Sequence, residues 1–256
     1  DNSVKPTANH AFVTDEGTMT LAKTGYADGA VSYTLGAAVK TEYGDIPAVY
    51  GDADEYPFAV FMDGKLIGAY SKWSDTGNNA VDAVKGTENS DKTVNILLRR
   101  DYINTKDTFW TLTQAGGTFV LDLGGHTFTR DSVFIDLSAN KFNDTVFPTN
   151  IVVKNGTALA LNGALIASQY NAAEGLENKE FNIAFDQVSF GFAEGAASKN
   201  LMWVMWDNER DIEGGKVNAV FNNCNFDLTT NAPDGKIVVF NFEDKFNRVD
   251  ISAVIN

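Results

Sequence analysis

The segment at residues 202–211, MWVMWDNERD, is the densest group of side chains that could do chemistry. Trp203 and Trp206 offer flat apolar rings of the kind that stack on sugars. The neighbouring groups able to hydrogen-bond sugar hydroxyls are Asp207, Glu209 and Arg210. Two carboxylates are also the minimum for glycoside hydrolysis. The segment therefore predicts a ligand-binding surface for a polysaccharide, although the alternating run LMWVMW also fits a strand covered on both faces and followed by a solvated loop.

A second acidic cluster lies in the segment GDADEY, which contains Asp52, Asp54 and Glu55. Oxygen ligands at this spacing can hold Ca²⁺, so these residues are the candidate metal site, and no other cofactor is expected. The glycine turn and the distal glutamate of an EF-hand are absent. Their absence favours a solvated acidic loop over a calcium site.

Three further groups have simple structural interpretations. Arg99 and Arg100 are rare cations in an acidic chain, and they are expected to pair at the surface with neighbouring aspartates, Asp101 or Asp131. His126 is expected to be a core or turn histidine with a satisfied ring nitrogen. Cys224 is expected to be a small, buried residue and not a nucleophile.

Composition and charge narrow the classes of function. The chain has 256 residues, 44% of them hydrophobic, and a formal net charge of −14, which disfavours nucleic acid and anionic membranes as partners. The longest apolar run, LMWVMW, is too short to cross a bilayer. A single cysteine allows no intrachain disulfide, and an acidic, cysteine-poor chain that opens without methionine fits a trimmed, exported bacterial protein found outside the cell or on its surface.

The chain contains an internal repeat. Apolar positions spaced +2 and +5 recur at intervals of 25 to 36 residues. The five copies are Ile96/Leu98/Ile103, Leu121/Leu123/Phe128, Val152/Lys154/Leu159, Ile183/Phe185/Phe190 and Ala219/Phe221/Phe226. Such a period indicates units that cannot close a core alone and must stack to bury a continuous one.

The spacing within each copy predicts strand, tight turn, strand. A +2 step keeps two side chains on one face of a strand, whereas a +5 step needs a bend between them. Four of the five residues at the bend are of types that favour turns; the five are Arg99, Gly124, Asn155, Asp186 and Asn222. The triplets should therefore form interior ladders, with Lys154 as the one irregular member, and Gly124-Gly125 is expected to be a structural turn.

The stacked units resemble the right-handed parallel β-helix of the pectate-lyase-like superfamily. This resemblance implies about five coils over residues 93–256, with Asn155 and Asn222 in a ladder of turn residues. Residues 57–129 also resemble the entry into β-helical modules of bacterial surface proteins. The expected fold class is thus all-β, a right-handed parallel β-helix with a short N-terminal capping helix and an N-terminal β region.

The first third of the chain is expected to close one end of this solenoid. Residues 57–70 predict a β-hairpin around Asp63-Gly64. Residues 74–86 contain a predicted short capping helix. Its residues 78–85 should be the longest helix in the chain and should cover the end of the solenoid with Val81 and Val84. Residues 1–56 are interpreted as an N-terminal β extension packed on the solenoid, and residues 57–256 as the capped β-helix, in one continuous domain.

The functional hypothesis is a noncatalytic, exported bacterial surface module that serves adhesion, spacing or glycan binding. The alternative is a carbohydrate-active enzyme, a polysaccharide lyase or glycoside hydrolase, that works on the outer face of one sheet. Adjacent aspartates are absent from the sequence, and no catalytic motif of the superfamily can be carried over to it. Because one scaffold hosts many functions, the noncatalytic hypothesis is favoured.

Overall fold

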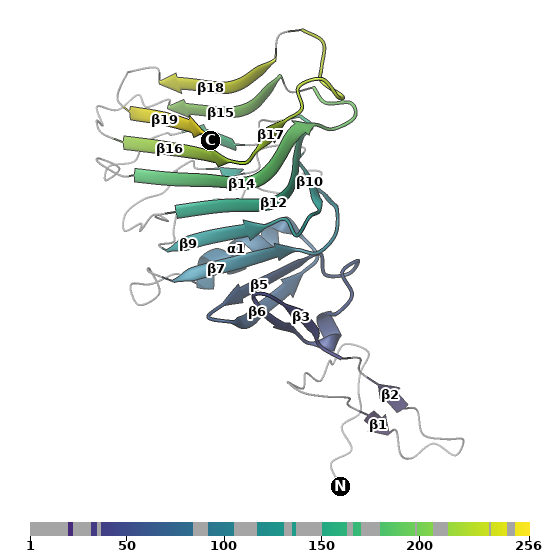
Figure 1. Cartoon of the computed structure of the whole chain (residues 1–256). Coiled ribbons are helices and arrows are strands. Elements are labelled where there is room, and N and C mark those ends of the chain that lie inside the picture. Colours follow the sequence, from purple (N-terminus) through teal and green to yellow (C-terminus); the bar gives the residue numbers. More distant parts are fainter. Residues whose placement is uncertain are drawn as a thin grey trace.

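The computed structural model describes most of the chain, and β-strands are its main element (Figure 1). The described residues are 20–22, 32–34, 37–83, 92–104, 117–130, 135–136, 150–162, 166–169, 180–197, 199–206, 215–235, 237–244 and 249–256. The predicted β class is therefore confirmed.

A long sheet forms the body of the molecule. From one edge to the other its strands are β6 (Lys65–Tyr70), β5 (Phe58–Met62), β7 (Thr93–Leu98), β9 (Thr118–Asp122), β12 (Asn150–Ala160), β14 (Glu180–Phe192), β16 (Gly215–Asn222) and β19 (Val249–Ile255). All pairings from β7 to β19 are parallel. Three short strands pair in parallel within the same sheet, beside the second halves of β12 and β14: β8 (Tyr102–Asn104), β10 (Thr127–Arg130) and β17 (Asn225–Phe226).

A second, four-stranded sheet is wholly parallel. It consists of β11 (Ile135–Asp136), β13 (Ile166–Gln169), β15 (Asn200–Trp206) and β18 (Val238–Asp244). Its strands alternate along the chain with those of the long sheet, and both sheets keep the sequence order of their strands. From β9 to β18, each passage of the chain therefore adds one strand to each sheet.

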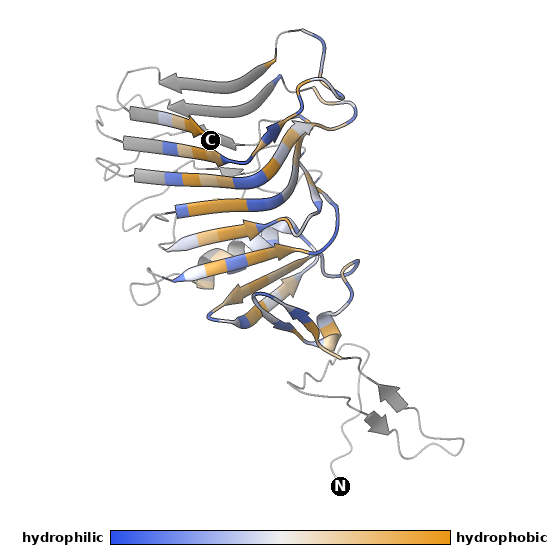
Figure 2. Ribbon diagram, in the orientation of Figure 1, coloured by the Kyte–Doolittle hydropathy of each residue, from blue (hydrophilic) through white to orange (hydrophobic). Residues whose placement is uncertain are grey.

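Most of the predicted triplets supply the core. Leu121, Leu123 and Phe128 are fully buried, and the copy at 183, 185 and 190 is at most 2% exposed. Figure 2 shows the resulting alternation of apolar and polar residues along the long sheet. For the copies at 121, 123, 128 and at 183, 185, 190, the predicted inward positions are thus confirmed.

Two copies were predicted wrongly. Ile103 is 62% exposed, because its neighbour Tyr102 is the residue that lies opposite Phe128. In the third copy the buried residues are one position earlier than predicted: Ile151, Val153 and Ala158. Lys154 consequently faces outward as expected, but it does so in regular strand geometry and without a local bulge.

The turns explain why the copies do not align along their whole length. Leu121 lies opposite Val153, which lies opposite Phe185, so the first position of the second copy meets the middle position of the fourth. The turn at Gly124-Gly125, with both φ values positive, absorbs two more residues than the turns of later passages. Those later turns are each made by one left-handed residue, namely Asn155, Gln187 and Asn223. The predicted turn residue Asn155 is confirmed, and Asp186 and Asn222 are each off by one.

One α-helix, α1 (Trp73–Ala83), lies in the described part of the chain, and it contacts β5, β6 and β7 (Figure 1). It starts five positions before the predicted 78–85. Its buried residues follow helical spacing: Trp73, Thr76, Gly77 and Ala80. Trp73 enters the core against Phe58 and Phe128, at ring-centroid distances of 5.4 and 5.1 Å. Val84 and the side chain of Val81 lie outside the described residues.

The segment before α1 forms the β5–β6 hairpin at one edge of the long sheet and a smaller strand pair packed against it. The predicted hairpin is confirmed as β5 and β6 around Asp63-Gly64, both at positive φ. A smaller antiparallel pair, β3 (Val39–Thr41) and β4 (Gly44–Ile46), precedes the 3-10 helix η1 (Ala48–Tyr50). Ile46 forms a buried cluster with Ala59 and Phe61. Further upstream, β1 (Thr20–Ala22) and β2 (Ser32–Thr34) form an antiparallel pair.

Candidate functional site

The ligand-binding residues predicted from the sequence fall largely outside the described residues. Trp203 and Trp206 belong to β15, where they lie in register with Asn241 and Asp244 of β18, but their side chains are outside the described part. Asp207, Glu209 and Arg210 are outside it altogether. The carbohydrate surface at this segment therefore stays a prediction.

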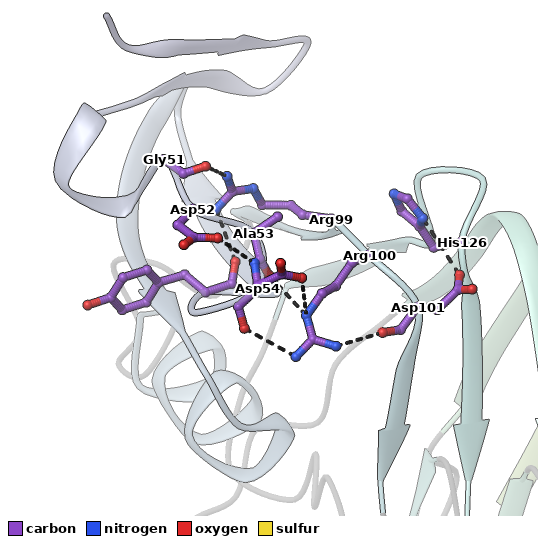
Figure 3. A network of polar contacts seen from close by, with 9 residues as sticks. Gly51, Asp52, Ala53, Asp54, Arg99, Arg100, Asp101 and His126 are labelled. Atoms are coloured by element: carbon purple, nitrogen blue, oxygen red, sulfur yellow. Dashed lines mark hydrogen bonds and ion pairs between the residues drawn. The ribbon is translucent and has the colours of Figure 1, made fainter. Parts of the chain in front are cut away.

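The acidic loop at 51–56 is held by hydrogen bonds of its own (Figure 3). The Asp52 carboxylate accepts the Asp54 N–H at 2.8 Å. The Asp54 carboxylate points instead to the Arg100 guanidinium, 3.8 Å away. Among the described residues, no three acidic, histidine or cysteine side chains are placed to hold a metal ion. Asp52, Asp54 and Glu55 thus shape and brace a loop and do not converge on a common point.

Arg99 fastens this loop to the sheet (Figure 3). Its guanidinium donates to the carbonyl oxygens of Tyr50, Gly51 and Tyr56, at 2.7, 2.6 and 3.0 Å. Burial lowers the pKa of the Arg99 guanidinium, although nearby Asp52 acts in the opposite direction. The predicted surface pairing with Asp101 is wrong for Arg99, because Arg99 donates to three backbone carbonyls instead; Asp131 lies outside the described residues.

Arg100 and His126 extend the contact along the same edge (Figure 3). Arg100 donates to the carbonyl oxygens of Ala53 and Asp54, and also to that of Asp101 at 2.9 Å. The Asp101 carboxylate accepts the Thr127 N–H and lies 3.7 Å from Nδ1 of His126. His126 is therefore a turn histidine beside a carboxylate, and this group of residues is an attachment of the loop.

Removing the Arg99 side chain should loosen the loop. We expect Arg99→Ala to lower the free energy of unfolding by about 2 kcal/mol, because a charged donor that serves three carbonyls is lost. Arg99→Lys should recover little, since one ammonium cannot reproduce the planar fork. Urea denaturation measures the change, and limited proteolysis should cut the variant faster within residues 50–56. Arg100→Ala, at a more exposed guanidinium, is the control and should cost less than about 1 kcal/mol; equal losses at both positions would contradict the assignment.

A second polar cluster joins the β3–β4 turn to the outer face of the long sheet. The hydroxyl of Tyr43 donates to Asp122 at 2.6 Å, and Asp122 is only 3% exposed. The same carboxylate accepts the Gly124 N–H at 2.9 Å and the Asn155 amide at 3.3 Å. Lys154 lies 3.4 Å from Asp122. The acceptor positions of Asp122 are therefore filled by protein groups.

The electrostatics of this cluster fix its protonation. Burial would raise the pKa of Asp122, but the hydrogen bonds from Tyr43 and Gly124 and the charge of Lys154 outweigh it and hold that pKa below its usual range. Burial, followed by the hydrogen bond to Asp122, raises the pKa of Tyr43 well above its ordinary value. Neither group exchanges a proton near neutral pH, so the pair is unsuited to general acid–base catalysis.

The remainder of the outer face presents three parallel rows of side chains. A central row is apolar and half-exposed: Val120, Val152, Ala184, Val220 and Val254. On one side lies a row of hydroxyl and amide groups: Thr118, Asn150, Asn182, Asn218 and Ser252. On the other side lie Asp122, Lys154, Asp186, Asn222 and Asn256.

The amides of this face hold one another in place. The Asn218 amide donates to Asn182 at 2.9 Å, and the Ser252 hydroxyl donates to Asn218 at 2.7 Å. The Asn256 amide donates to Asn222 at 2.9 Å in the opposite row. This surface was not predicted, although the sequence carries a signal for it: an asparagine directly precedes the inward residue Ile151, Ile183 or Ala219 in TNIVV, FNIAF and VNAVF. The face is flat, regular and preorganised for hydrogen bonding.

Cys224 does not add a reactive group to this picture. Its sulfur lies 3.4 Å from the carbonyl oxygen of Asn222 and 3.6 Å from that of Phe185. Burial raises the pKa of the thiol, whereas nucleophilic cysteines need a lowered pKa. The partly buried position agrees with the structural interpretation of this residue.

Two further findings concern a possible membrane span and similarity to known proteins. In the parts of the chain that the structure describes, no helix is long and apolar enough to cross a membrane. Comparison of the sequence and structure with protein-family models, curated proteins and solved structures gives no match.

Proposed function

We propose that this chain is a noncatalytic module of an exported bacterial surface protein, built as a right-handed parallel β-helix of the pectate-lyase-like type. The parallel strands from β7 to β19 in the long sheet and the wholly parallel second sheet, filled alternately by successive passages of the chain from β9 onward, support that architecture. Among the functions of adhesion, spacing and glycan binding, the outer face of the long sheet best supports contact with an extended glycan.

The row structure of the outer face carries this proposal. An apolar row between two polar rows suits a sugar chain, whose rings have apolar faces and whose edges carry hydroxyls. Amides such as Asn182 and Asn218 are already fixed by mutual hydrogen bonds, so binding a glycan costs little side-chain entropy. The buried acid Asp122 is ionised and enclosed by protein donors, which favours a binding face over a hydrolytic one.

A glycan array followed by titration tests the proposal. The double variant Asn182→Ala/Asn218→Ala removes both partners of one hydrogen bond, so the fold should tolerate it. We expect it to weaken glycan binding by about tenfold or more, equivalent to about 1.4 kcal/mol. Asn79→Ala is the matched control, because it removes an exposed amide on α1.

Other outcomes would redirect the assignment. Binding that survives the double variant but is lost in Trp203→Ala would place the surface at the β15 segment, as the sequence predicts. Cleavage of a bound polysaccharide, lost in Glu209→Ala, would favour the carbohydrate-active enzyme. Absence of binding to any glycan would overturn the glycan proposal and leave adhesion to protein or spacing.

A further inference from the structure

The rows of the outer face repeat once per strand along the stack (Figure 1). On β12, β14 and β16 the register partners of the central row are Val152, Ala184 and Val220. Beside them, the polar row places an asparagine on each of the same three strands. A ligand that crosses the strands therefore meets the same pair of groups, an apolar side chain and an amide, on every strand.

A ligand that lies along a single strand meets a different surface. Side chains on one face of a strand come from every second residue, so along β14 the ligand passes Asn182, Ala184 and Asp186 in turn. The chemical type changes at each step in this direction, whereas it is constant across the strands. Parallel strands lie about 4.8 Å apart, and an extended sugar chain has units of comparable length. The repetition therefore favours a polymer that runs across the strands.

The charges of this face disfavour an acidic polymer. Within the three described rows, Lys154 is the one cation, and its ammonium already lies 3.4 Å from Asp122 and 3.6 Å from Glu42. That ammonium is also 5.3 Å from the centroid of the Tyr43 ring. Asp186 adds a carboxylate on β14, and the whole chain has a formal net charge of −14. A polysaccharide with a carboxylate or sulfate on every unit would therefore be repelled without a matching cation.

On the basis of the proposed glycan-binding function, we propose that the ligand is a neutral polysaccharide with an extended backbone, bound across β12, β14 and β16. Its ring faces lie on the apolar row, and its hydroxyls meet the amides of the neighbouring polar row. The β3–β4 turn marks one end of this site, because its Tyr43 side chain lies against Asp122 of β9.

Matched pairs of oligosaccharides test the charge of the ligand. The probes are β-1,4-linked glucose and mannose oligomers, and the same oligomers oxidised at C6 to uronic acids, alongside a wider panel of neutral and uronate polysaccharides. We expect a neutral member to bind about tenfold or more tightly than its uronate counterpart in titration calorimetry. Its affinity should be equal at low and high salt, since salt screens interactions between charges.

Variants two strands apart test the direction of the polymer. Val152→Asp and Val220→Asp place a charge in the apolar row on β12 and on β16, and each should lower the affinity for the neutral oligosaccharide by about tenfold. The milder Val152→Thr and Val220→Thr keep a β-branched side chain suited to strands and should each lower it by about threefold. Ile67→Asp is the control, because Ile67 is an exposed apolar residue of β6 outside the three rows. Urea denaturation of every variant separates loss of binding from loss of fold.

The outcomes separate this inference from the function on which it rests. Tighter binding of a uronate member, or an affinity that falls steeply with salt, would overturn the neutral class and leave glycan binding intact. Loss of binding at Val152 or Val220 but not at both would overturn the crossing direction. Absence of binding to every member would overturn glycan binding itself. Loss at both positions in folded variants, with Ile67→Asp unchanged, would support the proposal.

Discussion

Replacing Ile96 by alanine is expected to lower the free energy of unfolding by about 2–5 kcal/mol, whereas the same replacement at Ile103 should change it by less than about 1 kcal/mol. Ile96 is fully buried and lies opposite Leu121 in an interior row. Its truncation leaves a cavity that the stacked strands cannot easily close. Ile103 is 62% exposed, so truncation there loses little burial.

Urea denaturation of the two variants measures this contrast with an identical chemical change. The pair also tests the structure against the repeat spacing. The spacing predicts that both isoleucines point inward, whereas in the structure only Ile96 does. Equal destabilisation at the two positions would support the spacing and would contradict the outward position of Ile103. A small effect at both would mean that the first passage contributes little to the core.

The sequence predicted the faces of the strands better than their register. A two-residue alternation identifies which side chains point inward, and it succeeded at Leu121 and Phe185 because both are inward in any register that shifts by two. Register depends on turn length, which the spacing alone does not specify. The Gly124-Gly125 turn absorbs two residues more than the turn at Gln187, so equivalent positions of the triplets separate along the stack.

The predicted start of the helix was wrong for a related reason. The prediction of a helix over residues 78–85 rests on Asn78 or Asn79 as the N-cap, a position that asparagine favours. Burial of Trp73 against the core outweighs that local preference. The packing partners, Phe58 and Phe128, are distant in sequence, so local propensity could not reveal them.

The polar clusters were harder to predict because their partners are also distant in sequence. Arg99 and Arg100 were recognised as unusual, but backbone carbonyls near residue 50 carry no sequence signature. The pairing of Tyr43 with Asp122 spans 79 positions and depends on how the β3–β4 turn docks. The asparagine row could have been found, since it repeats beside the apolar triplets. The repeating positions were therefore predictable from the sequence, whereas the contacts of the β3–β4 turn and of the loop near residue 50 were not.

Removal of the Asp122 carboxylate is expected to be the most costly polar change in the described residues. We expect Asp122→Ala to lower the free energy of unfolding by about 3 kcal/mol, because Tyr43 loses its acceptor and Lys154 loses a buried counter-charge. Chemical denaturation at neutral pH measures the loss. A change below about 1 kcal/mol would show that the β3–β4 turn is not anchored through this carboxylate.

The pH dependence of the same cluster has a definite sign at each extreme. The pKa of Asp122 is lowered in the folded state, so its contribution is present above the unfolded value near 4 and is lost as pH falls through the folded value. The pKa of Tyr43 is raised, so its contribution is full below about pH 10 and is lost as pH rises further.

The stability difference between wild type and Tyr43→Phe should therefore be about 2 kcal/mol and constant from about pH 5 to pH 9. It should shrink as the pH falls from about 4 towards the lowered pKa of folded Asp122, and again above about pH 10. Tyr70→Phe is the control, because burial is the first cause of the raised pKa of Tyr70 and its hydroxyl makes no hydrogen bond to a carboxylate of the described residues. Its difference should not change near pH 4, and a Tyr43→Phe difference equally flat there would show that the hydroxyl is not bonded to an ionised Asp122.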